Sequence, residues 1–208
     1  MESQDAILQK IETCVARRDK DAMQAARAEL VELYPESGGA SEAWYKLGLH
    51  ALMVDHDMDR ALECFVNSCR RKDSYWSLAA RTSMGICMYH QGQVQKSLFE
   101  LRKVGYVESP NIHSVTALAF IETIESAEGR SHEVKTVRNE RIKQLMKLVQ
   151  AKRRSADREL GEFLLSLGKA LKCDGHFAEA QSFLEQAKGL GEELLGRALL
   201  KSVVVELR

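Results

Sequence analysis

Proline is nearly absent from this chain of 208 residues, in which only Pro35 and Pro110 occur. Because proline disrupts helix interiors, two isolated prolines leave long stretches free to be helical. No strand-like alternation of apolar and polar residues persists over a useful length, which argues against a fold built on sheets. With an apolar content of 45%, enough for a sizeable core, these absences predict an all-α fold of about eleven helices.

Long apolar runs, paired cysteines and catalytic motifs are also missing. No segment approaches 18 consecutive apolar residues, so we expect no membrane span. The N-terminus lacks the basic-then-apolar run of a secretory signal. The five cysteines are odd in number and form no C-x-x-C pair, which favours a reducing compartment and a cytoplasmic protein. Phosphate-binding loops, GxSxG and HExxH are absent, so we expect neither an enzyme nor a cofactor.

What the chain does contain is a spaced pattern that occurs three times. Each copy has a large apolar residue, a small residue, a turn, and then a small-large-small series on a second helix. In the clearest copy, Gly168 has no side chain, so a second helix can approach it closely, and Gly175 ends the first helix. The three copies are Trp44, Leu47, Gly48, Ala61, Phe65 and Ser68; Arg81, Met84, Gly85, Met88, Gly92, Val94, Ser97, Leu101 and Val104; and Leu164, Leu167, Gly168, Leu171, Gly175, Phe177, Ala180, Leu184 and Ala187.

This pattern resembles the tetratricopeptide repeat (TPR), a helix hairpin of about 34 residues. Ala61 and Ser97 are 36 residues apart, and Ala26 precedes Ala61 by 35. The resemblance implies a TPR-like α-solenoid, a right-handed superhelix that runs as one domain over residues 1–208. A plain helical bundle is the alternative. The expected hairpins are 4–35, 40–71, 75–106, an irregular basic one at 111–151 with a lengthened second helix, and 156–190, followed by a capping helix at 192–207.

TPR proteins hold other proteins, so the resemblance implies a non-catalytic scaffold, adaptor or chaperone-like protein. In that family, the first helix of each hairpin lines a concave groove. Members that grip acidic chaperone C-termini use lysine, asparagine and arginine there. Here Tyr45, Leu49 and Ser83 occupy the matching positions, which favours an apolar or amphipathic peptide or helix as the partner. The implied groove residues are Tyr45, Leu49, Leu52, Met53, Thr82, Ile86, Tyr89 and His90.

An alternative is that several of these groove residues face the adjacent hairpin instead. For Leu49 and Ile86 the two interpretations carry equal weight. Tyr45, Tyr89 and His90 favour the groove, because aromatic anchors dominate this kind of binding.

Charge is uneven along the chain although the net charge is zero. Residues 135–158 contain nine basic and two acidic side chains, a local charge of +7. A solvated helix face, a docking surface for an acidic protein, and a contact with nucleic acid or an anionic membrane are the three interpretations. This stretch lacks Trp and Phe, which argues against base stacking and membrane binding. A regulatory protein acting through this surface is the alternative function; its residues are Lys135, Arg138, Lys143, Lys147, Lys152, Arg153 and Arg154.

Two further features remain. Residues 192–208 are apolar on more than one helix face, so they either fold back over the last hairpin or pair with a second copy of the chain as a homodimer.

Cys-x-x-His pairs occur at Cys87/His90 and Cys173/His176. Structural zinc sites draw their ligands from tight loops, whereas the first pair lies near a helix end, so we expect no metal.

Overall fold

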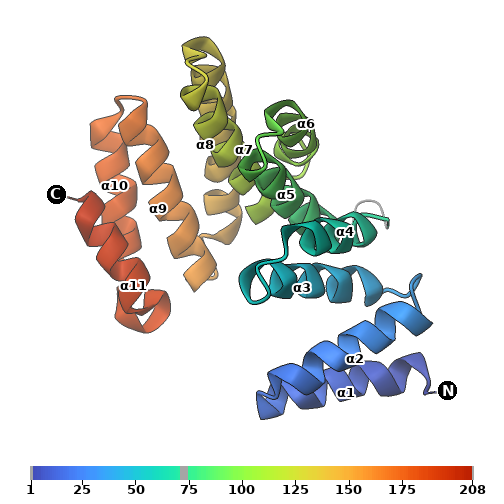
Figure 1. Cartoon of the computed structure of the whole chain (residues 1–208). Helices are drawn as coiled ribbons and strands as arrows, with labels where there is room; N and C mark the ends of the chain where they lie inside the picture. Colours follow the sequence, from blue (N-terminus) through green and yellow to red (C-terminus); the bar gives the residue numbers. More distant parts are fainter. Residues whose placement is uncertain (1, 71–74, 208) are drawn as a thin grey trace. The chain divides into compact units, whose positions relative to one another are not determined.

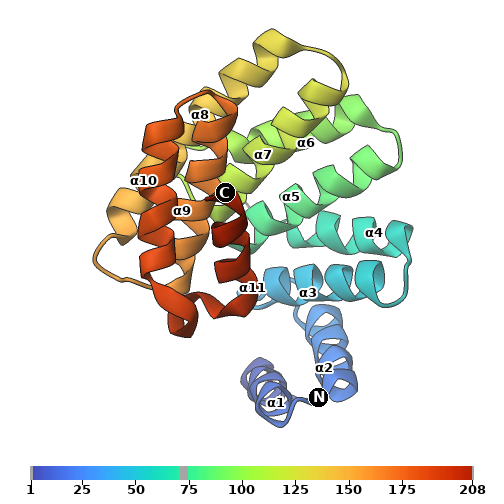
Figure 2. The same cartoon turned by 90° about the vertical axis from the view of Figure 1, so that its left-hand side faces the viewer.

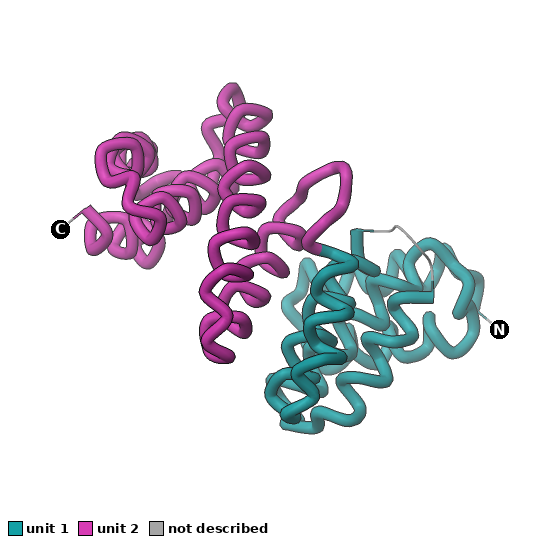
Figure 3. Tube along the Cα trace, turned by 90° about the horizontal axis from the view of Figure 1, so that it is seen from above, with its two compact units in different colours: residues 1–104 teal, residues 105–208 magenta. Residues whose placement is uncertain are grey.

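The computed structural model describes residues 2–70 and 75–207 and places eleven α-helices and no strand within them. The all-α class is therefore confirmed. Residue 71, the last of the expected 40–71 hairpin, lies outside the described residues. The chain divides into two compact units, residues 1–104 and 105–208 (Figure 3). The continuous single solenoid stays a prediction, and each unit is described here by itself.

Unit 1 is a series of helices in which each packs on the next along the chain, the last pair through Gly85 and Leu101 (Figure 1). The starts of α1, α2 and α4 are capped: the side-chain oxygens of Ser3, Asp19 and Asp57 each accept a backbone N–H three residues on. Such caps satisfy donors that a helix end leaves without partners. The helices are α1 (Gln4–Arg17), α2 (Lys20–Leu33), α3 (Ala40–Met53), α4 (Met58–Ser68), α5 (Tyr75–His90) and α6 (Val94–Gly105), whose last residue begins unit 2.

Glycines at the crossing points let paired helices approach closely. A Cβ at Gly48 would lie 2.6 Å from the Phe65 ring, and one at Gly85 would lie 2.7 Å from Leu101. Both distances are shorter than real Cβ contacts, so a side chain at either position would force the facing side chain to shift. The prediction that small residues of one helix receive large residues of the next is confirmed in α3/α4 and α5/α6.

Unit 2 contains a regular hairpin beside an irregular one. In the regular hairpin, a Cβ at Gly168 would lie 2.6 Å from Leu184, which repeats the arrangement of unit 1. The irregular hairpin has a 22-residue second helix and packs on the regular one through its α8–α9 contact. The helices are α7 (Ile112–Ala127), α8 (Ser131–Lys152), α9 (Arg158–Cys173), α10 (Phe177–Gly189) and α11 (Gly191–Glu206).

The C-terminal helix α11 folds back on α9 and α10 (Figure 2). Leu195 and Val203 are buried in the core of unit 2. Leu195 lies against Gly161, where any side chain would collide with it. The Glu206 carboxylate lies 3.4 Å from the Lys172 ammonium. Of the two alternatives for this segment, the structure shows the fold-back; pairing with a second copy stays a prediction.

Candidate protein-docking site

The groove residues expected on α3 are mostly packing residues. Tyr45, Leu49 and Leu52 are half-buried and contact a core cluster that includes Phe65. The Tyr45 ring centroid lies 6.0 Å from that of Phe65. Met53 differs, since 70% of it is exposed. For Leu49 the packing interpretation is therefore the better supported of the two, and Met53 is the α3 residue most available to a partner.

The groove residues expected on α5 also divide. Thr82 is only 4% exposed, and its hydroxyl donates to the Leu78 carbonyl at 2.9 Å, so it presents nothing to a partner. Ile86 is half-buried. Tyr89 is half-buried with its ring edge-on to His90 at 5.8 Å, and His90 is exposed. Tyr89 and His90 thus form the accessible part of this helix.

Trp76 is a member of this region that the sequence interpretation missed. Its ring centroid lies 5.5 Å from that of Tyr45, and the Lys46 ammonium lies 4.9 Å from the Trp76 centroid. A cation over an indole face is held by the ring quadrupole. The available signal was the adjacent pair Tyr75–Trp76 at the start of a predicted helix, outside the spacing of the repeat.

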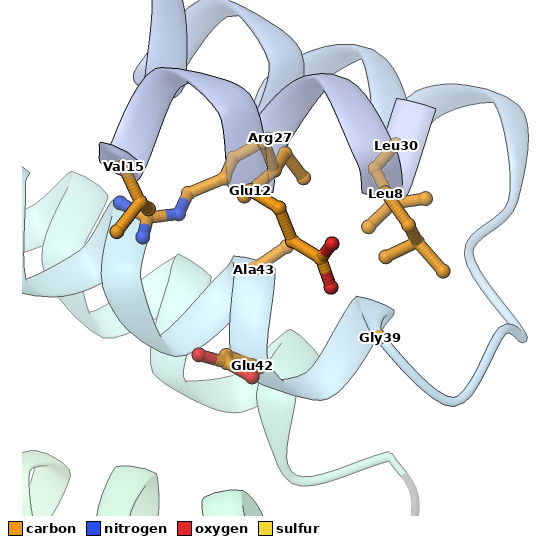
Figure 4. A pocket seen from close by; sticks show the side chains of 9 residues that line it. Leu8, Glu12, Val15, Arg27, Leu30, Gly39, Glu42 and Ala43 are labelled. Carbon is orange, nitrogen blue, oxygen red and sulfur yellow. The ribbon is translucent and has the colours of Figure 1, made fainter. Parts of the chain in front are cut away.

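The first three helices line an open cavity of about 310 Å³ in unit 1 (Figure 4). Apolar side chains form most of its wall, and three charged side chains complete it. Its apolar lining comes from Leu8, Ile11, Val15, Leu30 and Ala43; its charged lining is Glu12, Arg27 and Glu42, with Gly39 at one edge. We refer to these residues as the α1–α3 pocket.

Electrostatics in the α1–α3 pocket centre on one buried cation and two carboxylates. Arg27 is 9% exposed, and its Nη1 donates to Gln24 Oε1 at a long 3.5 Å. Burial lowers the pKa of Arg27, while the negative charge of Glu42 acts in the opposite direction. Within the described residues, neither Glu12 nor Glu42 forms a salt bridge, and Figure 4 shows the Glu12 carboxylate directed into the space between the helices.

Sequence interpretation missed this pocket because the first hairpin fits the repeat pattern only loosely. The signal was a stripe on α1: Leu8, Ile11 and Val15 recur at spacings of three and four, which places them on one face. The last of them, Val15, is 54% exposed. An apolar stripe that ends in an exposed valine is consistent with an unfilled surface.

Some side chains of the expected basic surface form ion pairs within the chain. Arg138 Nε lies 2.7 Å from Glu122 Oε1, and Arg141 Nη2 lies 2.9 Å from Glu122 Oε2. Arg138 also donates to the Cys173 carbonyl at 2.8 Å. These two arginines therefore tie α8 to α7, and Arg138 ties it to the end of α9.

The remaining cations of the basic surface are of two kinds. Lys143 lies 3.4 Å from Glu140, and Lys152 lies 3.4 Å from Asp157 and 2.5 Å from Glu159. The others are exposed and form no salt bridge with any described residue: Lys135, Lys147, Arg153 and Arg154. These four cations are thus the part of the surface with no described ion pair, and Lys143 is also exposed beside them.

The described residues also bear on metal binding, thiol chemistry and membrane spans. Residues 2–70 and 75–207 contain no group of three or more His, Cys, Asp or Glu side chains placed to hold a metal ion. Cys87 is buried, and burial raises the pKa of its thiol, which disfavours the reactive thiolate. Among these same residues, no helix combines the length and apolarity needed to cross a membrane.

Comparison with models of known protein families and with curated protein sequences yields no match. Solved structures do match. A crystal structure of the Podosopora anserina putative kinesin light chain, with nearly identical TPR-like repeats, is 18% identical, with a TM-score of 0.52 over 93% of this chain and 98% of that one. PilW, a type IV pilus biogenesis factor, is 14% identical, with a TM-score of 0.54 over 97% and 83%. MamA is 14% identical, with a TM-score of 0.52 over 91% and 92%.

The helical hairpins, their glycine crossings and these neighbours agree on one class. The protein has the fold of TPR-like helical repeat proteins, as the spacing in its sequence predicts. At these identities the likeness concerns the fold, and the function has to be argued from the surfaces of this chain.

Proposed function

We propose that the chain is a non-catalytic scaffold that binds a segment of a partner protein on unit 1. The observation that carries the proposal is the α1–α3 pocket, a mostly apolar cavity lined by both helices of the first hairpin and the start of the next one. Pockets with apolar walls and a few polar groups are the usual form of a binding site. The TPR-like fold supports the same conclusion, because stacked hairpins present rigid surfaces to extended partners.

The pocket belongs to a longer stripe on α3. Glu42, Lys46, Leu49 and Met53 follow one another at spacings of four, three and four, so they share one side of the helix. The pocket residue Glu42 and the exposed Met53 are therefore the two ends of a continuous surface about three turns long. Such a surface suits a peptide or an amphipathic helix with several anchor residues.

A rigid surface also lowers the cost of binding. Within the α3 stripe, Leu49 packs against the core cluster that contains the fully buried Phe65. Because this core holds α3 in place, the partner bears most of the entropy loss on binding.

The test is a selection of displayed random 12-residue peptides on the immobilised full chain. The selected peptides are then measured against two variants. Val15→Trp places a large side chain in the pocket lining, and Val66→Trp makes the same change on α4, outside it. The two valines are matched controls, since they are 54% and 52% exposed. We expect Val15→Trp to weaken binding at least tenfold and Val66→Trp to leave it unchanged. Equal binding by both variants would exclude the pocket as the docking site.

A second candidate is an acidic protein surface bound through α8. Four exposed cations that form no salt bridge within residues 2–70 and 75–207 favour it: Lys135, Lys147, Arg153 and Arg154. Salt separates the candidates, because exposed charge contacts weaken steeply as salt rises while an apolar pocket responds little. Reversing Lys147 and Arg153 to glutamate tests the α8 surface alone.

We also propose a cytoplasmic location. All five cysteines are free thiols in the structure, and three of them are buried. A secreted chain with this many cysteines would be expected to form disulfides.

A further inference from the structure

We propose that the α1–α3 pocket takes an aliphatic side chain of a partner segment that carries a lysine or arginine about one helical turn away. This inference rests on the proposed function and specifies the chemistry of the partner. Size, wall chemistry and charge each contribute to it.

Size limits the occupant. A volume of about 310 Å³ is at the lower end of the range of ligand pockets, which runs from about 300 to 1,000 Å³. The space therefore fits one or two side chains and not a large cofactor. Methyl groups of Leu8, Ile11 and Leu30 line it, and an apolar side chain placed among them loses its contact with water and gains contacts.

Glu12 is the reason that the partner segment needs a cation near its aliphatic side chain. Its carboxylate is directed into the pocket, and it has no salt-bridge partner among the described residues. When an apolar side chain displaces water from the pocket, this carboxylate loses part of its hydration. Glu12 is exposed in the unbound chain, so a cation from the partner compensates for that loss through a partly screened ion pair, which a neutral partner does not form.

Arg27 restricts where that cation is placed. It is the buried cation of the pocket and already interacts electrostatically with Glu42. Glu12 is thus the carboxylate left for the partner. An incoming lysine or arginine is favoured beside Glu12 and repelled from the Arg27 side, which fixes the direction in which a segment lies.

The charge close to the pocket acts the same way. Residues 2–69, which contain α1 to α4, carry thirteen acidic and seven basic side chains, a net charge of −6, although residues 1–104 together carry only −1. Within a short, salt-dependent range, this local excess of acidic groups favours cationic segments over acidic ones. It also disfavours phosphate groups, so nucleic acid is a poor occupant of this pocket.

The experiment uses the selected 12-residue peptides and the full chain. We expect the peptides that Val15→Trp loses to contain Leu, Ile or Met with Lys or Arg three or four positions away. Glu12→Gln, which keeps the shape of the side chain, should weaken these peptides about threefold to tenfold, the range of a partly exposed charge pair. Glu63→Gln, on exposed α4 surface of the same unit, is the matched control and should change nothing. Raising the salt concentration should reduce the difference between wild type and Glu12→Gln.

Two contrary results are distinguishable. Peptides that depend on Val15 but lack cations, or that bind Glu12→Gln as well as wild type, would overturn this inference and leave the docking function standing. Peptides that bind Val15→Trp and wild type equally would overturn the docking function and this inference together.

Discussion

The regular hairpin α9/α10 and the irregular hairpin α7/α8 lie in the same unit but are held together differently. In α9/α10, Gly168 lets Leu184 of the facing helix approach, and the contact is apolar. In α7/α8, the contact contains charged and polar groups: Glu122 binds Arg138 and Arg141, and the Ser114 hydroxyl donates to Gln144 Oε1 at 2.8 Å. Gln144 in turn donates to the Gly105 carbonyl at 2.8 Å.

This difference explains why one hairpin matches the repeat pattern and the other does not. An apolar crossing requires a small residue opposite a large one, so its spacing is fixed and visible in the sequence. A polar crossing requires complementary groups within hydrogen-bond or ion-pair distance. Long polar side chains can meet this requirement from many positions in the sequence, so no fixed spacing results. It also requires that each buried charge keep its partner, since a lone buried charge is strongly unfavourable.

The largest expected effect is the loss of Glu122. Glu122→Ala removes the carboxylate that Arg138 and Arg141 share in a largely buried site. Arg138 keeps the Cys173 carbonyl and the more distant Asp174 carboxylate at 3.8 Å, so Arg141 is affected most. We expect the free energy of unfolding to fall by about 3 kcal/mol, measured by urea denaturation. The control is Glu185→Ala on the exposed surface of α10, for which we expect a change within about 0.5 kcal/mol. Similar small changes for both variants would mean that the buried ion pairs do not hold α7 to α8.

The apolar crossing is tested by glycine substitution. Gly168→Ala forces a methyl group against Leu184, and we expect a loss of about 2 kcal/mol despite the higher helix propensity of alanine. Gly189→Ala, at the end of α10 with open space around it, should be neutral or slightly stabilising. If thermal denaturation shows that both alanines stabilise the chain, the close crossing is not the reason for the glycine.

Two tyrosines test which groove residues are structural. Tyr45 packs against Phe65 and Trp76, so Tyr45→Ala should lower the free energy of unfolding by about 1.5 kcal/mol. Tyr89 has an exposed ring partner, His90. We therefore expect Tyr89→Ala to lower the free energy of unfolding by less than half of that amount. Denaturant titration of the two variants measures both changes. Equal losses in the free energy of unfolding would place Tyr89 in the core as well.

The smallest effect concerns pH and the start of α7. Burial lowers the pKa of His113 below its ordinary value of about 6.5. The folded state therefore binds the proton less readily than the unfolded state, and stability falls as pH decreases through about 6.5 toward the folded pKa. We expect the melting temperature of the wild type to fall more steeply between pH 7 and pH 5 than that of His113→Phe. Parallel pH profiles would contradict this assignment.

The fold class was predictable because the residues that make the contacts of a helix hairpin recur at short, fixed spacings in the sequence. The triplet Gly168, Ala180 and Leu184 shows this: each contact is set by residue size alone. The ion pairs of the basic surface were not predictable. Glu122 lies on α7, outside the window of residues 135–158, and Glu159 lies one residue beyond its end. A local charge of +7 therefore overstates the charge that a partner meets.

The candidate site was predictable only in part. Position in the repeat identified Met53 and His90, which are exposed, but it also included Thr82, which is buried. Position within a repeat cannot tell a residue that lines a groove from one that contacts the next helix. The α1–α3 pocket depends on three helices meeting around a volume that no side chain fills, and the distances between helices are not encoded in any local pattern.

The most direct test of the account is methyl NMR of the full chain during titration with a selected peptide. The predicted result is that the first methyl signals to shift are those of Leu8, Ile11, Val15 and Leu30, which line the α1–α3 pocket, and that Val15→Trp abolishes these shifts. Shifts confined to methyl groups of α8, such as Met146, with the pocket signals unchanged, would contradict it and move the docking site to the basic helix.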